Sequence, residues 1–161
     1  YNTGDFPMNR KLLEERINGK AQLHIGSINE TLNAFIKTMS PEAPVGFVSV
    51  DVDYYSSTKA VFELFKAKSN LFLPLTHIYF DDISKDNHNN KCGELLAIKE
   101  FNKENKLREI SYHRFLENQR LFKNANWLKQ IYYFHVLDHE YRFKTERTEA
   151  KRVLDNPYLN I

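Results

Sequence analysis

Two apolar segments that end in acidic residues constrain the fold more than any other feature of this chain. The first, PVGFVSVD at 44–51, is rich in β-branched residues and shows no strict alternation, which is typical of a strand buried on both faces of a parallel sheet. The second, LTHIYFDD at 75–82, has the same character, and a helical pattern lies between the two. Strand, helix and strand in this order predict a βαβ unit, in which two parallel strands are joined by a right-handed crossover.

The rest of the chain predicts further elements around this unit. Helices are expected at about 8–17, after Ser27 and at about 92–104, and strands at 21–26, about 107–114 and about 127–137. Their alternation predicts an α/β fold with a Rossmann-like, mostly parallel sheet and flanking helices. Trp127 and the aromatic residues of the last strand are expected in the core. We predict a domain at 1–139 and a charged C-terminal extension at 140–161, a surface helix or an extended segment.

Composition excludes several classes of protein. The 161 residues are 42% hydrophobic and 14% aromatic, which is typical of one globular domain. The 23 Lys and Arg nearly balance the 21 Asp and Glu, so a net charge of +2 gives no attraction to nucleic acid or to an anionic membrane. No apolar run approaches the roughly 18 residues of a membrane span. The single cysteine, Cys92, cannot form an internal disulfide, and no signal peptide is visible, which favours the cytoplasm.

Asp51 and Asp53 end the first apolar segment, and Asp81 and Asp82 end the second. Because ligands of parallel α/β sheets bind beyond the carboxyl ends of the strands, up to four carboxylates are expected in one small volume. Such crowding raises the pKa values of the acids unless a cation lies between them, and oxygen ligands favour Mg²⁺. Both acid pairs also have purely structural explanations. Asp53 could supply a helix N-cap, and the acids after Phe80 could belong to a solvated loop. The two pairs together favour a metal or catalytic site.

At this point the sequence resembles a known family. VGFVSVDVDYYSST followed by HIYFDD is similar to the macrocin O-methyltransferase branch of the class I S-adenosylmethionine-dependent methyltransferases, in which an apolar strand leads into Asp-x-Asp-x-Tyr and a later strand ends in Asp-Asp. LHIGSINETL at 23–32 and GELLAIKEFN at 93–102 extend the resemblance more weakly. It covers about residues 5–137.

The resemblance implies roles for particular residues. Asp51, Asp81 and Asp82 would hold Mg²⁺ or a similar divalent ion, and Asp53 would be the catalytic base, with Tyr54 as the alternative base. Gly26 and Ser27, together with Asp51, would border S-adenosylmethionine, although a serine after a glycine is equally expected at the start of any helix. The expected partner is a small molecule with a hydroxyl group, such as a vicinal diol of a sugar or a catechol-like ring. Homo-oligomerisation is left open.

One feature of the family is missing. The five glycines of the chain are too widely spaced to form the glycine-rich turn that cradles the cofactor, and the first convincing strand resembles the family's third. We therefore expect the C-terminal part of a longer protein, without the first strands of the fold, or a divergent chain that has lost cofactor binding. In either case the chain alone is expected to bind S-adenosylmethionine weakly.

Three other functions remain open. A metal-dependent nucleotide-sugar glycosyltransferase would use Asp51 and Asp53 as its DxD motif but leaves Asp81 and Asp82 unexplained. A phosphatase with a DxD nucleophile is disfavoured by Tyr54 and Tyr55, which replace the usual small β-branched residues. A non-catalytic α/β remnant would bind a partner through an exposed sheet edge.

Overall fold

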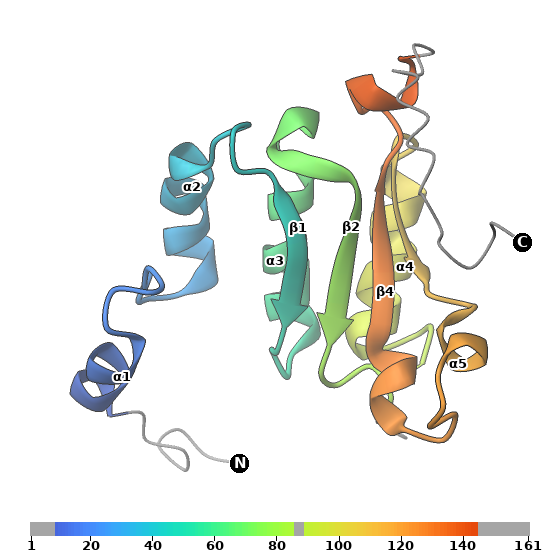
Figure 1. The fold of residues 1–161 in the computed structure, drawn as a ribbon, viewed down its shortest axis with the longest axis horizontal. Helices are drawn as coiled ribbons and strands as arrows, with labels where there is room; N and C mark the ends of the chain where they lie inside the picture. Colours follow the sequence, from blue (N-terminus) through green and yellow to red (C-terminus); the bar gives the residue numbers. More distant parts are fainter. Residues whose placement is uncertain (1–8, 86–88, 145–161) are drawn as a thin grey trace, which may run out of the picture. The chain divides into compact units, whose positions relative to one another are not determined.

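The computed structural model describes residues 9–85 and 89–144 (Figure 1). The chain divides into two compact units, with the boundary between Thr38 and Met39. The first unit carries two helices, and the second carries the sheet with its helices and both acidic pairs. Each unit is described by itself.

In the first unit, α1 (Arg10–Ile17) and α2 (Ile28–Thr38) are joined by an extended segment. Asn9 caps α1 through a 3.1 Å hydrogen bond from the Leu12 N–H to its side-chain oxygen, and α1 is followed by Asn18 in the left-handed conformation. The strand predicted at 21–26 is wrong: these residues form no ladder, and their side chains are exposed. A strand forms only where a neighbouring strand takes up its backbone N–H and C=O groups.

In the second unit, the described residues form a four-stranded sheet in the order β1-β2-β4-β3. The strands are β1 (Val45–Val50), β2 (Phe72–Phe80), β3 (Arg108–Tyr112) and β4 (Ile131–Val136). The expected α/β class and the parallel pairing of β1 with β2 are confirmed. The expectation of a mostly parallel sheet is wrong, because β4 pairs antiparallel with both β2 and β3.

The reversal of β4 follows from the connection before it. A parallel return needs a crossover long enough to run the length of the sheet. Between β3 and β4 the described chain forms only the four-residue helix α5 (Leu116–Gln119) and a 3₁₀ turn at Asn126–Gln130. The chain therefore turns back at the same end of the sheet at which β3 stops. Trp127 lies in that 3₁₀ turn and is 44% exposed, so its expected place in the core is wrong.

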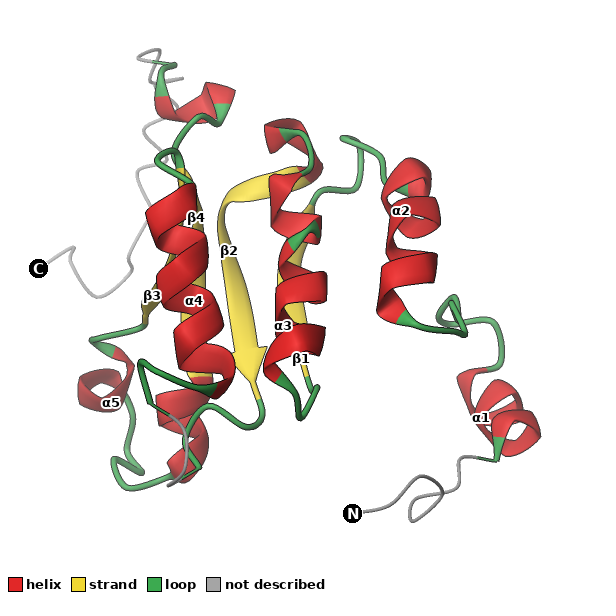
Figure 2. Cartoon of the chain, turned by 180° about the vertical axis from the view of Figure 1, so that it is seen from behind, coloured by secondary structure: helices red, strands yellow, loops and turns green. Residues whose placement is uncertain are grey.

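Two helices, α3 (Tyr55–Phe62) and α4 (Gly93–Glu104), cover one face of the sheet (Figure 2). Phe65, in the turn after α3, lies 4.5 Å between ring centroids from Phe134 of β4. Further ring contacts join the fully buried phenylalanines into one cluster, made of Phe62, Phe65, Phe72, Phe80, Phe101 and Phe134. This cluster is the core that packs β2 and β4 against the helices.

Asn102 of α4 closes the free edge of β3. Its amide nitrogen donates to the Ile110 carbonyl at 2.8 Å, and its side-chain oxygen accepts from the Ile110 N–H at 2.8 Å. Ile110 is 1% exposed, so these backbone groups have little access to water. The side chain thus satisfies one residue of an edge strand, where another strand would otherwise pair.

Asn102→Ala should therefore destabilise the fold. It leaves a buried N–H and a buried C=O without partners, and each such group costs about 1–3 kcal/mol. We expect a loss of about 2–6 kcal/mol in the free energy of unfolding, measured by urea denaturation. Asn33→Ala, at an exposed position of α2, is the matched control and should change stability little. Equal stability of the two variants would show that water replaces the Asn102 contacts.

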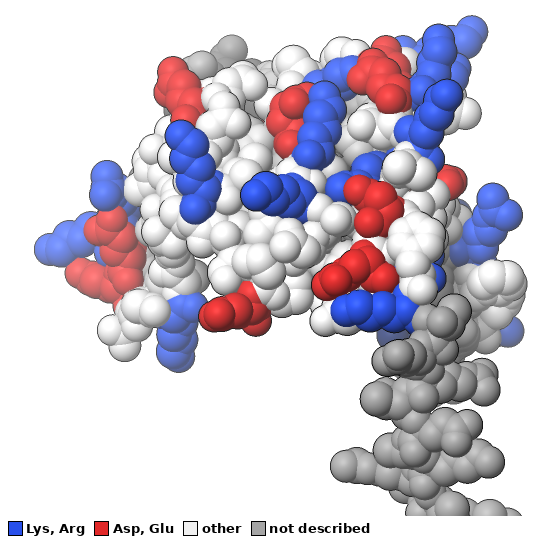
Figure 3. Space-filling model, turned by 90° about the horizontal axis from the view of Figure 1, so that it is seen from above, with Lys and Arg blue, Asp and Glu red and all other residues white. Residues whose placement is uncertain are grey.

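The surface carries both signs of charge. On the face shown in Figure 3, Lys and Arg side chains are interspersed with Asp and Glu, and no patch of a single sign forms there. Among the described helices, none has the length and apolar character needed to cross a membrane.

Candidate functional site

The strands β1 and β2 are parallel, so their carboxyl ends meet at one edge of the sheet, where both arrows of Figure 1 stop. The backbone N–H of Asp81 donates to the Val50 carbonyl at 3.0 Å, which joins the two strand ends directly. Asp51 and Asp53 follow β1, and Asp81 and Asp82 follow β2. We call these four residues the acidic edge.

Asp51 and Asp53 are both exposed in the turn between β1 and α3. The helix begins at Tyr55, and its N-cap is Tyr54, whose carbonyl accepts from the Thr58 N–H at 3.0 Å and from the Thr58 hydroxyl at 3.1 Å. Asp53 is therefore not the N-cap of this helix, so helix capping does not explain the aspartate at this position. Tyr54 itself is 69% exposed and available to solvent.

Asp81 is held by polar partners. The Tyr79 hydroxyl donates to its Oδ1 at 2.8 Å, and the Gln130 side chain donates to its carbonyl oxygen at 2.5 Å. The hydrogen bond to Asp81 raises the pKa of Tyr79, so this hydroxyl keeps its proton at neutral pH. Asp81 is thus a fixed acceptor, positioned from β2 and from the turn before β4.

Asp82 is the buried member of the acidic edge, with 2% of its surface exposed. The Lys85 ammonium forms an ion pair with its Oδ1, and this pairing raises the pKa of Lys85. The Asp53 and Asp81 carboxylates also raise the pKa of Lys85. Lys85 is therefore a cation that interacts with three members of the acidic edge.

Glu94, in the first turn of α4, is a further acid of this region that the sequence analysis missed. It is 1% exposed, and neither of its carboxylate oxygens has a hydrogen-bond partner in the described part of the chain. Burial raises its pKa to about 8, and the nearby charges of Asp82, Asp81 and Asp51 act in the same direction. The sequence signal was weak, because an acid in the first turn of a helix is ordinarily a solvated partner of the helix dipole.

The acids do not form one cluster. Asp81 and Asp82 have different partners: the Tyr79 hydroxyl meets Asp81, whereas Asp82 pairs with Lys85. Over residues 9–85 and 89–144, no three His, Cys, Asp or Glu side chains make up a group that could hold a metal ion. The metal-binding role of Asp51, Asp81 and Asp82 therefore stays a prediction, and an all-protein cage is not preformed.

A pocket opens next to Asp82. It has a volume of 390 Å³ and is lined by the loop after β2, by α5 and by the beginning of β4, with Ile83, Ser84, Tyr112, Glu117, Lys129 and Tyr132 in its wall. The Tyr112 hydroxyl donates to Glu117 at 3.1 Å, and burial raises the pKa of Tyr132 to about 12. The pocket thus combines two aromatic rings with protonated hydroxyls, which suits a small polar or aromatic molecule.

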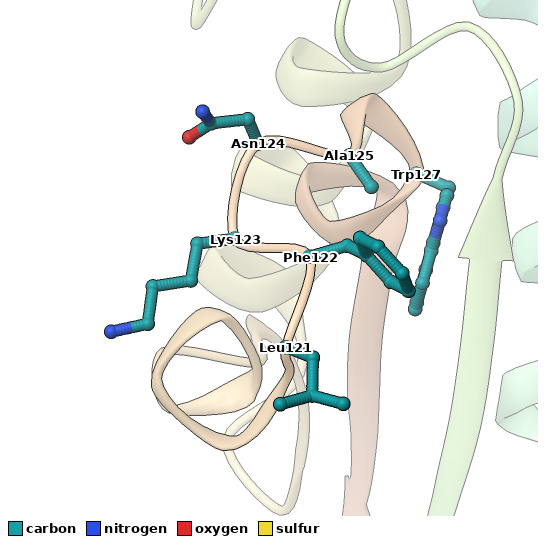
Figure 4. A pocket seen from close by; sticks show the side chains of 6 residues that line it. All are labelled: Leu121, Phe122, Lys123, Asn124, Ala125 and Trp127. Atoms are coloured by element: carbon teal, nitrogen blue, oxygen red, sulfur yellow. The ribbon is translucent and has the colours of Figure 1, made fainter.

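A larger hollow of 740 Å³ lies in the segment before β4. All of its lining comes from residues 121–127, and Figure 4 shows the Phe122 and Trp127 rings side by side while Lys123 extends away. Leu121 and Phe122 are 97% and 79% exposed. Because a single loop forms this hollow and no acid lines it, the pocket beside Asp82 is the better substrate site.

Comparison of the chain with protein-family models, with curated proteins and with solved structures finds no match.

Function is therefore inferred from the geometry of the acidic edge. Gly26 and Ser27, which the sequence places beside a cofactor, belong to the first unit and directly precede α2. Gly26 has a φ of 143°, and a Cβ added there would lie 3.0 Å from Thr31 Cγ2, so the turn has no room for a side chain. Their role at a cofactor stays a prediction.

Proposed function

We propose that the chain is part of a divalent-metal-assisted O-methyltransferase that uses S-adenosylmethionine and acts on a small molecule with a vicinal diol. The observation that carries the proposal is the placement of two acid pairs at the carboxyl ends of two adjacent parallel strands, with Asp82 buried and a pocket beside it. Ligand sites of α/β sheets lie at this edge.

The order of the strands supports the same proposal. Since β4 is antiparallel to both β2 and β3, the strand β3 runs in the same direction as β1 and β2. Strands that run in one direction place their carboxyl ends at the same edge of the sheet, where α/β folds bind ligands.

The acidic edge has the donors that a hard divalent cation prefers. Mg²⁺ is commonly held by one or two carboxylates, and water and substrate oxygens complete its shell. Asp51, Asp81 and Asp82 would supply these carboxylates, and the nearby buried Glu94, whose carboxylate oxygens have no hydrogen-bond partner among the described residues, fits such an ion. A bound cation there would acidify and orient the two hydroxyls of a diol.

Asp53 would then take the proton from the acceptor hydroxyl. The residue is exposed, is not the helix cap, and lies close enough to Lys85 to raise the pKa of that ammonium. A carboxylate within hydrogen-bond reach of the acceptor can serve as general base, while the methyl group is displaced in line from the sulfonium. Tyr54 is the second candidate, because it is adjacent and exposed.

Asp51 would border S-adenosylmethionine, and the cofactor role of Gly26 and Ser27, which belong to the first unit, stays a prediction from the sequence. The sequence lacks a glycine-rich turn, so these residues give only part of a cofactor site. A glycosyltransferase would use Asp51 and Asp53 and leave the buried Asp82 without a role. For this reason the methyltransferase is preferred.

Methyl transfer tests the proposal directly. This chain and any longer natural version of it are incubated with methyl-labelled S-adenosylmethionine and catechol as the diol probe. We expect label in the catechol with Mg²⁺ present, loss of transfer with EDTA, and recovery when Mg²⁺ is added back. Metal-dependent binding of a nucleotide sugar, with no transfer of label by any version, would overturn the proposal.

A further inference from the structure

We propose that Asp82 and Glu94 together bind one divalent cation on the helix-covered side of the acidic edge, and that Lys85 is the counterion which this cation replaces. The inference deepens the proposed function and rests on its metal site, to which it adds a ligand that the motif resemblance does not contain.

Burial is the first observation. Asp82 and Glu94 are 2% and 1% exposed, and they come from different elements, the end of β2 and the first turn of α4. An isolated buried carboxylate is costly, so buried acids are normally paired or bind a metal. Glu94 has no hydrogen-bond donor among the described residues and no ion-pair partner there.

Charge balance is the second observation. Lys85 forms an ion pair with Asp82, but no cation among the described residues pairs with Glu94, so a metal that displaces the Glu94 proton would meet two carboxylates. A divalent cation between them would neutralise both. The Lys85 side chain is 55% exposed, so it can move into solvent without a large change in packing.

The coordination chemistry agrees with a site of two carboxylates. No group of three suitable side chains is found in the described part, which excludes a closed cage there but not a two-carboxylate site completed by water. Mg²⁺ and Mn²⁺ both accept such a shell of oxygen ligands. The 390 Å³ pocket has Ile83, the residue directly after Asp82, in its wall.

Metal affinity can be measured with Mn²⁺ alone, by electron paramagnetic resonance of free Mn²⁺ and by calorimetry. Glu94→Gln keeps the size of the side chain but removes its charge, so it should weaken Mn²⁺ binding by at least the 10–100-fold typical for loss of an outer-shell partner. Lys85→Met removes the competing cation and should tighten binding. A cation site at Asp82 and Glu94 therefore predicts changes in Mn²⁺ affinity of opposite sign for the two variants.

Two matched controls separate local from general electrostatics. Glu104→Gln makes the same change at the exposed end of α4, and Lys91→Met makes the same change at an exposed lysine. Both should leave Mn²⁺ affinity within about two-fold of the parent, because exposed charges are screened by salt. Melting temperatures of all variants show that each is folded.

The outcomes distinguish this inference from the proposed function. Parent-like Mn²⁺ affinity in Glu94→Gln, with weakened binding in Asp51→Asn, would overturn the role of Glu94 and leave the metal-assisted methyltransferase intact. Mn²⁺ binding that depends on Glu94 without any methyl transfer would support the cation site and contradict the methyltransferase. No Mn²⁺ binding by the parent protein would overturn the cation site.

Discussion

In metal-free buffer, Glu94→Gln should be more stable than the parent protein, and the difference should grow as the pH rises. The folded-state pKa of Glu94 is about 8, against an ordinary value of 4.5. Below pH 4.5, Glu94 is protonated in both the folded and the unfolded chain, and its contribution to stability is fully present. As the pH rises towards 8, the unfolded chain releases the proton that the folded chain keeps, so the free energy of unfolding falls. Each pKa unit corresponds to about 1.36 kcal/mol, so the loss by pH 8 is about 3–5 kcal/mol.

Urea denaturation between pH 4.5 and 8.5, with EDTA present, measures this effect. The parent should lose stability across the window, whereas Glu94→Gln should lose much less, since glutamine does not ionise. Glu104→Gln, on the exposed end of the same helix, should follow the parent curve. Parallel curves for the parent and Glu94→Gln would mean that water reaches the Glu94 carboxylate and that its pKa is ordinary.

The parallel pair β1 and β2 could be predicted from the sequence because local and tertiary requirements agree there. Val48, Val50 and Ile78 favour strands by their β-branched side chains, and the fold buries Val50 and Ile78 under the helices. The acids directly after these strands had to lie at one edge once the strands were parallel. Both the fold class and the acidic edge were therefore accessible without a structure.

The errors occur where tertiary context decides. The segment 21–26 has strand-like composition, but no described strand pairs with it, and its side chains are exposed. The direction of β4 depends on how far the chain travels after β3, which periodicity does not report. Trp127 is apolar enough for the core, yet it falls in the turn where the chain reverses.

Glu94 was missed for a different reason. Its residue type and its place in the first turn of α4 indicate a solvated acid, and only the packing of α4 over the end of β2 makes it a buried one. The different partners of the two neighbouring acids also come from the fold: Asp81 accepts a hydrogen bond from Tyr79, and Asp82 pairs with Lys85. Burial of a charge is a property of the fold as a whole, so single-sequence patterns rarely contain it.

Replacing Asp53 should lower the rate of methyl transfer, and replacing Asp51 should weaken metal binding, although the two residues are only two positions apart. If Asp53 is the base, Asp53→Asn should lower methyl transfer to the diol by about 10²–10⁴-fold and leave Mn²⁺ affinity unchanged, because the amide keeps the shape but cannot accept the proton. If Asp51 is a metal ligand, Asp51→Asn should weaken Mn²⁺ binding, and a high metal concentration should restore part of the lost rate. Both residues are exposed, and Tyr54 rather than Asp53 caps α3.

Because Asp51 and Asp53 are exposed, their replacement should alter stability by less than about 0.5 kcal/mol, as is usual for surface residues. A lost rate or a weaker metal affinity can then be assigned to the site itself. Rates, Mn²⁺ affinities and melting temperatures are compared for Asp53→Asn, Asp51→Asn and Tyr54→Phe in any version of the protein that transfers the methyl group. Tyr54→Phe is the control for Asp53, since it removes the neighbouring hydroxyl and should leave most of the rate. If Asp53→Asn retains the parent rate and Tyr54→Phe loses it, the proton is taken by the tyrosine, and the base assigned to the acidic edge is wrong.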